Sequence, residues 1–197
     1  LFYEALPWSE STRRERLNVF SELAKYLIPG LVPDAVPPVV VAPIRAVMTR
    51  TIPRRDFLKA TQTLKIGDKR DLVETLSKLV GIGYEYSNIV VQPGQFARRG
   101  GLIDLWSPAS ALPIRFEFFG NEIDTIKTFD PTTQRSLETL DIARVYPASE
   151  ALPEKHASSD KATLDSHENA HIISEATIPH LYRFHSSLLD YLPENAL

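Results

Sequence analysis

Residues 94–136 have the sequence GQFARRGGLIDLWSPASALPIRFEFFGNEIDTIKTFDPTTQRS. This segment combines a Gly-Gly pair inside an apolar strand pattern, an alternating run in which Arg and Glu stand beside Phe, and a Gly-Asn pair. Gly120-Asn121 is a good two-residue hairpin turn, because glycine supplies the positive φ of a type II′ turn. The segment predicts antiparallel strands, and it is typical of a recognition surface on a small sheet rather than of a catalytic pocket.

Alternation along a strand assigns the residues of 114–119 to two faces. The hairpin turn places Phe119 opposite Glu122 and Glu117 opposite Asp124, with Arg115 near both acids. We expect one face to belong to the core and the other to point outward. The core face takes Ile114, Phe116 and Phe118, and the outward face takes Arg115, Glu117 and Phe119.

Two interpretations of the outward face stay open. Arg115 and Glu117 can form a solvated strand face, since exposed ion pairs contribute only about 0–1 kcal/mol. Phe119 beside them favours a protein-binding hot spot, which combines apolar area with a forked donor. A loop of the same domain can also cover Phe119, in which case the residue belongs to the fold.

The pair Gly100-Gly101 interrupts an expected strand at 95–106. Glycines inside a strand pattern predict a bulge or a close backbone approach. Simple alternation then cannot decide whether Arg98 or Arg99 faces outward. We expect Trp106 to pack against the domain, and Asp104 can cap a turn.

The rest of the chain predicts an α+β module that follows a piece of an α/β layer and precedes a polar segment and a helix. The module is placed at residues 51–148, and the flanking pieces at 1–50 and 149–197. Both the α/β and α+β classes are thus expected, with a mainly antiparallel sheet and one helix in the module. The expected helices are 10–27, 44–50, 69–80 with Asp68 as its cap, and 172–192 after a polar segment at 154–170. The expected strands are a buried parallel strand at 39–42 and strands at 62–66, 84–91, 95–106, 113–119, 122–129 and 140–146.

Composition bounds the function classes. The 197 residues are 43% hydrophobic and 24% charged, which is ordinary for a soluble globular protein. The absence of cysteine excludes disulfides, thiolate metal sites and cysteine nucleophiles, and it fits a reducing cytoplasm. The net charge is −3, and the sequence contains no strongly basic stripe. Both observations argue against tight non-specific binding to nucleic acid. Because the chain opens on Leu1 instead of Met, we expect it to be a fragment of a longer protein.

One motif suggests a different function. His167-Glu168-Asn169-Ala170-His171 fits H-E-x-x-H, the zinc-protease pattern with a general-base Glu between two ligands. The motif lies where a polar segment gives way to helical spacing and has no clear third ligand, which favours an exposed helix start over a metallopeptidase. The sequence contains no P-loop, no G-x-S-x-G and no dinucleotide fingerprint. We therefore expect no catalysis, no cofactor and no metal for this chain.

Three motifs of the opening segment together resemble a known family. They are Phe-x-x-Arg-Gly at 96–100, Arg-Phe-Glu-Phe-Phe-Gly at 115–120 and Phe-Asp-x-x-x-Gln-Arg-Ser at 129–136. The run resembles the second domain of bacterial transcription-repair coupling factors (Mfd), a domain shared with the excision-repair protein UvrB. Weaker similarity extends over nearly the whole chain and implies a UvrB-like α/β domain on both sides of the module. UvrB itself is the alternative; its arginine at the position of Ala97 favours the coupling factors.

The resemblance implies that the module is a non-catalytic docking domain for UvrA, the damage-sensing ATPase. Such a domain recruits UvrA so that stalled transcription is coupled to nucleotide excision repair. The parts of the family that bind RNA polymerase and that move on double-stranded DNA with ATP lie outside this chain. The resemblance also implies a cytoplasmic protein with no membrane partner. The family's contact residues carry over to Arg99, Arg115, Glu117 and Phe119, with Arg98 as a further contact if it substitutes for the arginine missing at Ala97.

Overall fold

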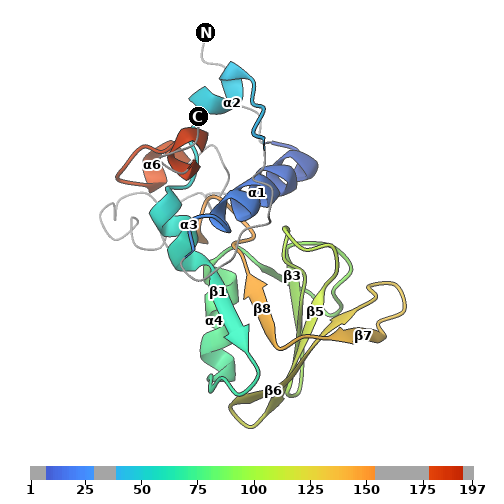
Figure 1. Cartoon of the computed structure of the whole chain (residues 1–197). Helices are drawn as coiled ribbons and strands as arrows, with labels where there is room; N and C mark the ends of the chain where they lie inside the picture. Colours follow the sequence, from blue (N-terminus) through green and yellow to red (C-terminus); the bar gives the residue numbers. More distant parts are fainter. Residues whose placement is uncertain (1–7, 29–38, 154–177, 193–197) are drawn as a thin grey trace, which may run out of the picture.

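A computed structural model describes residues 8–28, 39–153 and 178–192. Most helices gather at one end of the molecule and the strands at the other (Figure 1). The helices are α1 (Glu10–Ala24), α2 (Ile44–Met48), α3 (Arg54–Ala60), α4 (Leu72–Gly81), α6 (Ile178–Leu181) and the 3-10 helix η3 (Leu188–Tyr191). The strands are β1 (Gln62–Lys65), β2 (Glu85–Tyr86), β3 (Gln95–Arg99), β4 (Leu102–Leu105), β5 (Ile114–Phe119), β6 (Glu122–Phe129), β7 (Ser136–Thr139) and β8 (Ile142–Val145).

The main sheet has six strands in the order β2-β3-β4-β5-β6-β7. Every neighbouring pair is antiparallel except β2 and β3, which run parallel. Strands β1 and β8 form a separate antiparallel pair. The prediction of a mixed fold with a mainly antiparallel sheet is confirmed. Strand β7, which the sequence analysis did not predict, adds an exposed edge to this sheet.

The Gly-Gly pair lies in a turn and does not interrupt a single strand. Gly100 and Gly101 join β3 to β4, so the expected continuous strand at 95–106 was wrong. Gly100 has φ +62°, and a Cβ on Gly101 would lie 2.8 Å from the carbonyl oxygen of Phe118. The expected close backbone approach is therefore present, but between strands. The other hairpin turn is as predicted, with Gly120 at φ +62°.

The N-terminal flank is helical as predicted, but it has no strand among the described residues. In α1, the Ser9 side chain accepts a hydrogen bond from the Thr12 backbone N–H, and an apolar stripe that includes Phe20 is buried. The expected buried strand at 39–42 was wrong: Val39 and Val41 are 89% and 90% exposed. A strand needs a neighbour for its backbone hydrogen bonds, and no described segment pairs with this one.

Two other expectations about helices were also wrong. The cap of α4 is Asp71, whose carboxylate accepts a hydrogen bond from the Glu74 backbone N–H at 2.9 Å, whereas Asp68 accepts one from the Lys65 backbone N–H within a turn. The expected helix at 172–192 is replaced, within residues 178–192, by α6 and η3 with non-helical chain between them. Ser187 caps η3 in a capping box, which starts a new helix where the periodic pattern predicted a continuous one.

One hydrophobic core joins the module to its flanks. Phe20 of α1, Phe57 of α3 and Tyr191 of η3 form an aromatic cluster with ring centroids 4.6–6.1 Å apart. Beside it, the Arg16 guanidinium binds the buried Glu150 carboxylate through two hydrogen bonds of 2.6 and 3.1 Å. Helix α1 is thereby held against α3, against η3 and against the chain that follows the module.

Candidate protein-binding face

The face of the main sheet that bears Arg115, Glu117 and Phe119, here called the outer face, is the candidate site. On the core side of β5, Ile114 and Phe116 are buried, and Phe118 packs against the same core, as alternation predicts. The partner strands contribute to the outer face through the sheet register. Asp104 stands opposite Arg115, Leu102 opposite Glu117, Lys127 opposite Arg115, and Thr125 opposite Glu117.

Phe119 is the outstanding apolar residue of the outer face. Its side chain is 84% exposed at the end of β5, directly opposite Glu122, and this pairing is the predicted one. No loop among the described residues covers it, so the interpretation of Phe119 as a covered residue is wrong for this part of the chain. A phenylalanine left in water on a polar strand face leaves apolar area that binding can bury.

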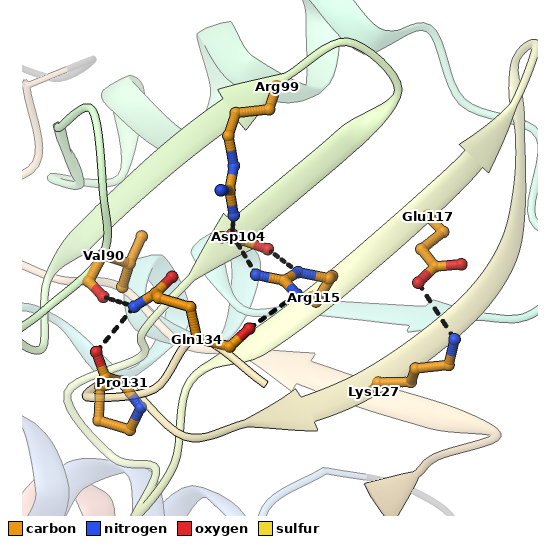
Figure 2. Close-up of polar contacts among 8 residues, drawn as sticks. All are labelled: Val90, Arg99, Asp104, Arg115, Glu117, Lys127, Pro131 and Gln134. Atoms are coloured by element: carbon orange, nitrogen blue, oxygen red, sulfur yellow. Dashed lines mark hydrogen bonds and ion pairs between the residues drawn. The ribbon is translucent and has the colours of Figure 1, made fainter. Parts of the chain in front are cut away.

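Asp104 lies at the centre of the outer face and binds two arginines (Figure 2). Its side chain is 2% exposed. One carboxylate oxygen, Oδ1, accepts from Nε of Arg115 at 2.7 Å; the other, Oδ2, accepts from Arg115 Nη2 at 2.9 Å and from Arg99 Nη2 at 2.7 Å. The expectation that Asp104 caps a turn was wrong, because it pairs across strands with residues that simple sequence spacing does not bring together.

Arg115 is enclosed on several sides. Its guanidinium carbon lies 4.7 Å from the centroid of the Phe129 ring, and its Nη1 donates to the Gln134 carbonyl oxygen at 3.2 Å. The side chain is 11% exposed. The hydrogen bonds to Asp104 raise the pKa of Arg115 above its ordinary value, so the guanidinium is always charged. Much of the donor capacity of Arg115 is therefore used inside the protein.

The loop after β6 supplies the Gln134 carbonyl. At the start of this loop, the Asp130 carboxylate accepts hydrogen bonds from the backbone N–H groups of Thr132 and Thr133. These hydrogen bonds hold the pKa of Asp130 below its ordinary value. Gln134 has φ +61°, and its amide donates to the carbonyl oxygens of Val90 and Pro131 at 3.2 and 2.7 Å. These contacts hold the left-handed backbone of Gln134 in place. The motif at 129–136 thus encloses one side of the Arg115 side chain.

Glu117 pairs with Lys127 at 3.1 Å, and both side chains are about one third exposed. The predicted register, with Glu117 opposite Asp124, was wrong, because a shift between Glu117 and Phe118 places Thr125 there. Arg115 interacts electrostatically with Glu117, as expected, but the ion pair of Arg115 is with Asp104 and that of Glu117 is with Lys127. The Thr125 hydroxyl and the Lys127 ammonium lower the pKa of Glu117. Since the Thr125 hydroxyl makes no hydrogen bond of standard geometry, we attribute the lower pKa chiefly to Lys127.

The two arginines before the turn face opposite ways. Because the glycines lie in the turn, alternation holds along β3, and Arg99 shares the outer face with Asp104 while Arg98 pairs with Ile103. Arg99 is 49% exposed. Arg98 is exposed, and its Nε donates to the Gly100 carbonyl oxygen at 3.2 Å. The structure therefore brings Arg99, Arg115 and Glu117 onto the face of Phe119 and does not bring Arg98 there.

Ala97 lies on this same face by register, opposite Asp104, but it is buried and cannot contact a partner. It is buried in a small cluster with Val90 and Phe129, against which Trp106 packs as expected. The indole N–H of Trp106 donates to the Ser110 carbonyl oxygen at 3.0 Å. Position 97 thus carries a small side chain that packs under the loop that contains Val90, and not an arginine that could reach a partner.

Sequence reasoning missed Asp104 and Lys127 as members of the site. A signal for Asp104 was present, since it is a single acid between the apolar residues Ile103 and Leu105 in a strand pattern. A buried acid requires a cationic partner, but its identity depends on the strand register. No comparable local signal marks Lys127.

The zinc motif at His167, Glu168 and His171 lies outside the described residues. Within the residues that the structure describes, no group of three or more His, Asp or Glu is placed to hold a metal ion. In the same part of the chain, no helix has the length and apolar character needed to cross a membrane.

Comparison with known proteins gives a consistent result. A family model described as the UvrB interaction domain matches residues 63–150. The transcription-repair-coupling factor of Bacillus subtilis (strain 168) is 32% identical over 221 residues, covering 96% of this chain and 18% of that protein. That of Escherichia coli (strain K12) is 34% identical over 121 residues, covering 60% and 10%, and that of Staphylococcus aureus (strain MRSA252) is 41% identical over 88 residues, covering 45% and 7%. The chain spans less than a fifth of the length of these relatives.

Proposed function

Residues 63–150 are a UvrB interaction domain and the chain is related over 96% of its length to a transcription-repair-coupling factor, and from this premise we propose that it is a non-catalytic module that binds UvrA. Binding recruits UvrA to the place where transcription has stalled and so couples transcription to nucleotide excision repair in the cytoplasm. The chain performs this role without a cofactor of its own. In the whole protein, contact with RNA polymerase and ATP-driven movement on double-stranded DNA belong to regions outside this chain.

The observation that carries the proposal is the exposure of Phe119 on a face of fixed charges. Hot spots of protein interfaces combine a large apolar side chain with arginine, surrounded by polar groups that exclude water. On the outer face, Phe119 supplies the apolar area and Arg99 supplies unused N–H donors. Glu117 supplies a carboxylate, which pairs with Lys127.

The contact residues have unequal roles in this proposal. Phe119 is the anchor, and burial of its ring is worth about 2 kcal/mol. Arg99 and Glu117 pair with opposite charges on UvrA and set the register of docking. Arg115 presents only an edge to the partner and shapes the face from within, while Arg98 is at most a peripheral contact at the turn.

Hydroxyl-radical footprinting tests this proposal, because phenylalanine rings are oxidised when solvent reaches them. Phe119 and Phe184 are 84% and 70% exposed and serve as a matched pair within one chain. At a saturating concentration of purified UvrA, fixed by titration, we expect the oxidation of Phe119 to fall several-fold and that of Phe184 to stay unchanged. Absence of binding in the titration refutes the function, and unchanged oxidation of Phe119 in the complex refutes the assigned face.

A further inference from the structure

Asp104, the central carboxylate of the outer face, binds two arginines, although one would suffice to pair a buried carboxylate. Asp104 stands in β4 between Ile103 and Leu105, all three of them buried. A buried carboxylate needs a partner, and the bidentate pair with Arg115 already engages both of its oxygens. The additional hydrogen bond from Arg99 Nη2 to Oδ2, at 2.7 Å, reaches a carboxylate that is already paired.

We propose that Asp104 is a positioning residue for partner binding, which holds the guanidinium of Arg99 in one place on the outer face so that its free N–H groups meet a carboxylate of the partner. The proposal rests on the proposed function, since the partner is UvrA. One carboxylate balances one of the two arginines, so the trio keeps a net positive charge. The hydrogen bond uses Nη2 of Arg99 and leaves Nε and Nη1 for a second acid.

The neighbouring arginine provides a natural comparison. Arg98 and Arg99 are adjacent, and both side chains reach solvent. Arg98 has no acidic partner among the described residues, and its Nε donates to the Gly100 carbonyl oxygen two residues away. Arg99 is bound by a buried carboxylate that also binds Arg115, and the Arg115 guanidinium in turn contacts the Phe129 ring and the Gln134 carbonyl oxygen.

Prior ordering of a long side chain improves affinity because binding then loses less conformational entropy. For one arginine this gain corresponds to about fivefold to tenfold in Kd. Without Asp104, Arg99 and Arg115 would also repel each other, so that Arg99 would turn away from the face. The expected loss of affinity thus arises through Arg99 and not through a contact of Asp104 with UvrA.

A double-mutant cycle tests this route. The Kd for purified UvrA is measured for the wild-type chain, for Asp104→Asn, for Arg99→Ala and for the double variant, each first shown to be folded by circular dichroism. We expect Asp104→Asn to weaken binding about tenfold when Arg99 is present and less than twofold when Arg99 is replaced by alanine. Asp141→Asn, at an exposed carboxylate between β7 and β8, is the matched control and should leave Kd unchanged.

Equal losses in both Arg99 backgrounds would overturn the proposal, because Asp104 would then act only through the fold. An unchanged Kd for Asp104→Asn would overturn it as well. An effect of stability alone would not depend on whether residue 99 is arginine, so it would appear as equal losses in the two backgrounds, whereas the proposal requires the loss to depend on Arg99.

A second measurement needs neither a variant nor UvrA. Nitrogen-15 relaxation of the arginine Nε–Hε groups in the free chain should show Arg99 restricted and Arg98 mobile on the nanosecond timescale. Equal mobility of the two side chains would refute the positioning of Arg99. A restricted Arg99 in a chain that does not bind UvrA would refute the proposed function and leave the positioning of Arg99 intact.

Discussion

Replacing Arg115 by alanine should destabilise the whole domain, although the residue lies on a candidate binding face. The substitution removes both hydrogen bonds that join Arg115 to Asp104, the contact over the Phe129 ring and the hydrogen bond to the Gln134 carbonyl oxygen. Asp104 remains in the protein interior with a single hydrogen bond from the half-exposed Arg99.

The magnitude follows from the burial of Asp104. Removing one partner of a buried ion pair costs about 3–5 kcal/mol, because the other charge is left uncompensated. Arg99 offsets part of this cost, so we expect the free energy of unfolding to fall by about 2–4 kcal/mol. With a urea dependence of about 1–3 kcal/mol per molar, the midpoint should fall by about 1–2 M.

Urea unfolding followed by tryptophan fluorescence measures this loss, since Trp106 packs against the cluster that contains Phe129. Lys127→Ala is the matched control: it removes the partner of Glu117, a pair about one third exposed, and should cost less than about 1 kcal/mol. A loss for Arg115→Ala as small as that of the control would refute the account of Asp104 as a buried, partnered acid. Restoration of much of the stability by the double variant with Asp104→Ala would support it.

Two further predictions concern single positions. Lys127 keeps the pKa of Glu117 below its ordinary value of 4.5, so the carboxylate's contribution to stability is present above about pH 4.5 and is lost as the pH falls through the lowered pKa. Lys127→Met should therefore raise the pKa of Glu117 in an NMR titration. An unchanged pKa would assign the effect to Thr125. Gly101→Ala should cost about 1–3 kcal/mol in urea unfolding, because its Cβ would lie 2.8 Å from the Phe118 carbonyl oxygen, whereas Gly120→Ala, with open space and φ +62°, should cost about 1 kcal/mol. Equal losses of stability for the two variants would show that the cost comes from backbone conformation and not from the contact with the Phe118 carbonyl oxygen.

Local periodicity predicted the parts of this site that depend on neighbours in sequence. The run 114–119 has strict alternation and a glycine turn after it, so the faces of Phe116 and Phe119 followed directly. Helix α1 was found for the same reason, because its apolar residues repeat at helical spacing. These features need no knowledge of what lies across the sheet.

Features that depend on distant partners could not be predicted in the same way. Asp104 meets Arg115 because a specific register aligns β4 with β5, and the shift between Glu117 and Phe118 changes the neighbours of Glu117. Strand β7 has four exposed residues and no apolar alternation to reveal it. The valines at 39–42 have the composition of a buried strand, but a strand forms only where a neighbouring strand can pair with it.

The motif at 129–136 also shows how a family motif can serve the scaffold as much as the contact. In the motif at 129–136, Phe129 lies under the Arg115 guanidinium and Gln134 supplies a backbone acceptor for it. Phe129 is buried and Gln134 is only partly exposed, yet both help to determine where the charges of the outer face stand. A search for contact residues alone would overlook them.

The affinity of the Phe119→Ala chain for purified UvrA tests the central claim most directly. Phe119 is so exposed that its removal should change the free energy of unfolding by less than about 0.5 kcal/mol, and Phe184→Ala provides the same substitution at an exposed ring elsewhere. We predict that Phe119→Ala raises Kd in isothermal titration by about 30-fold, equivalent to about 2 kcal/mol, while Phe184→Ala leaves it within twofold of the wild type. A wild-type Kd for Phe119→Ala would contradict the account.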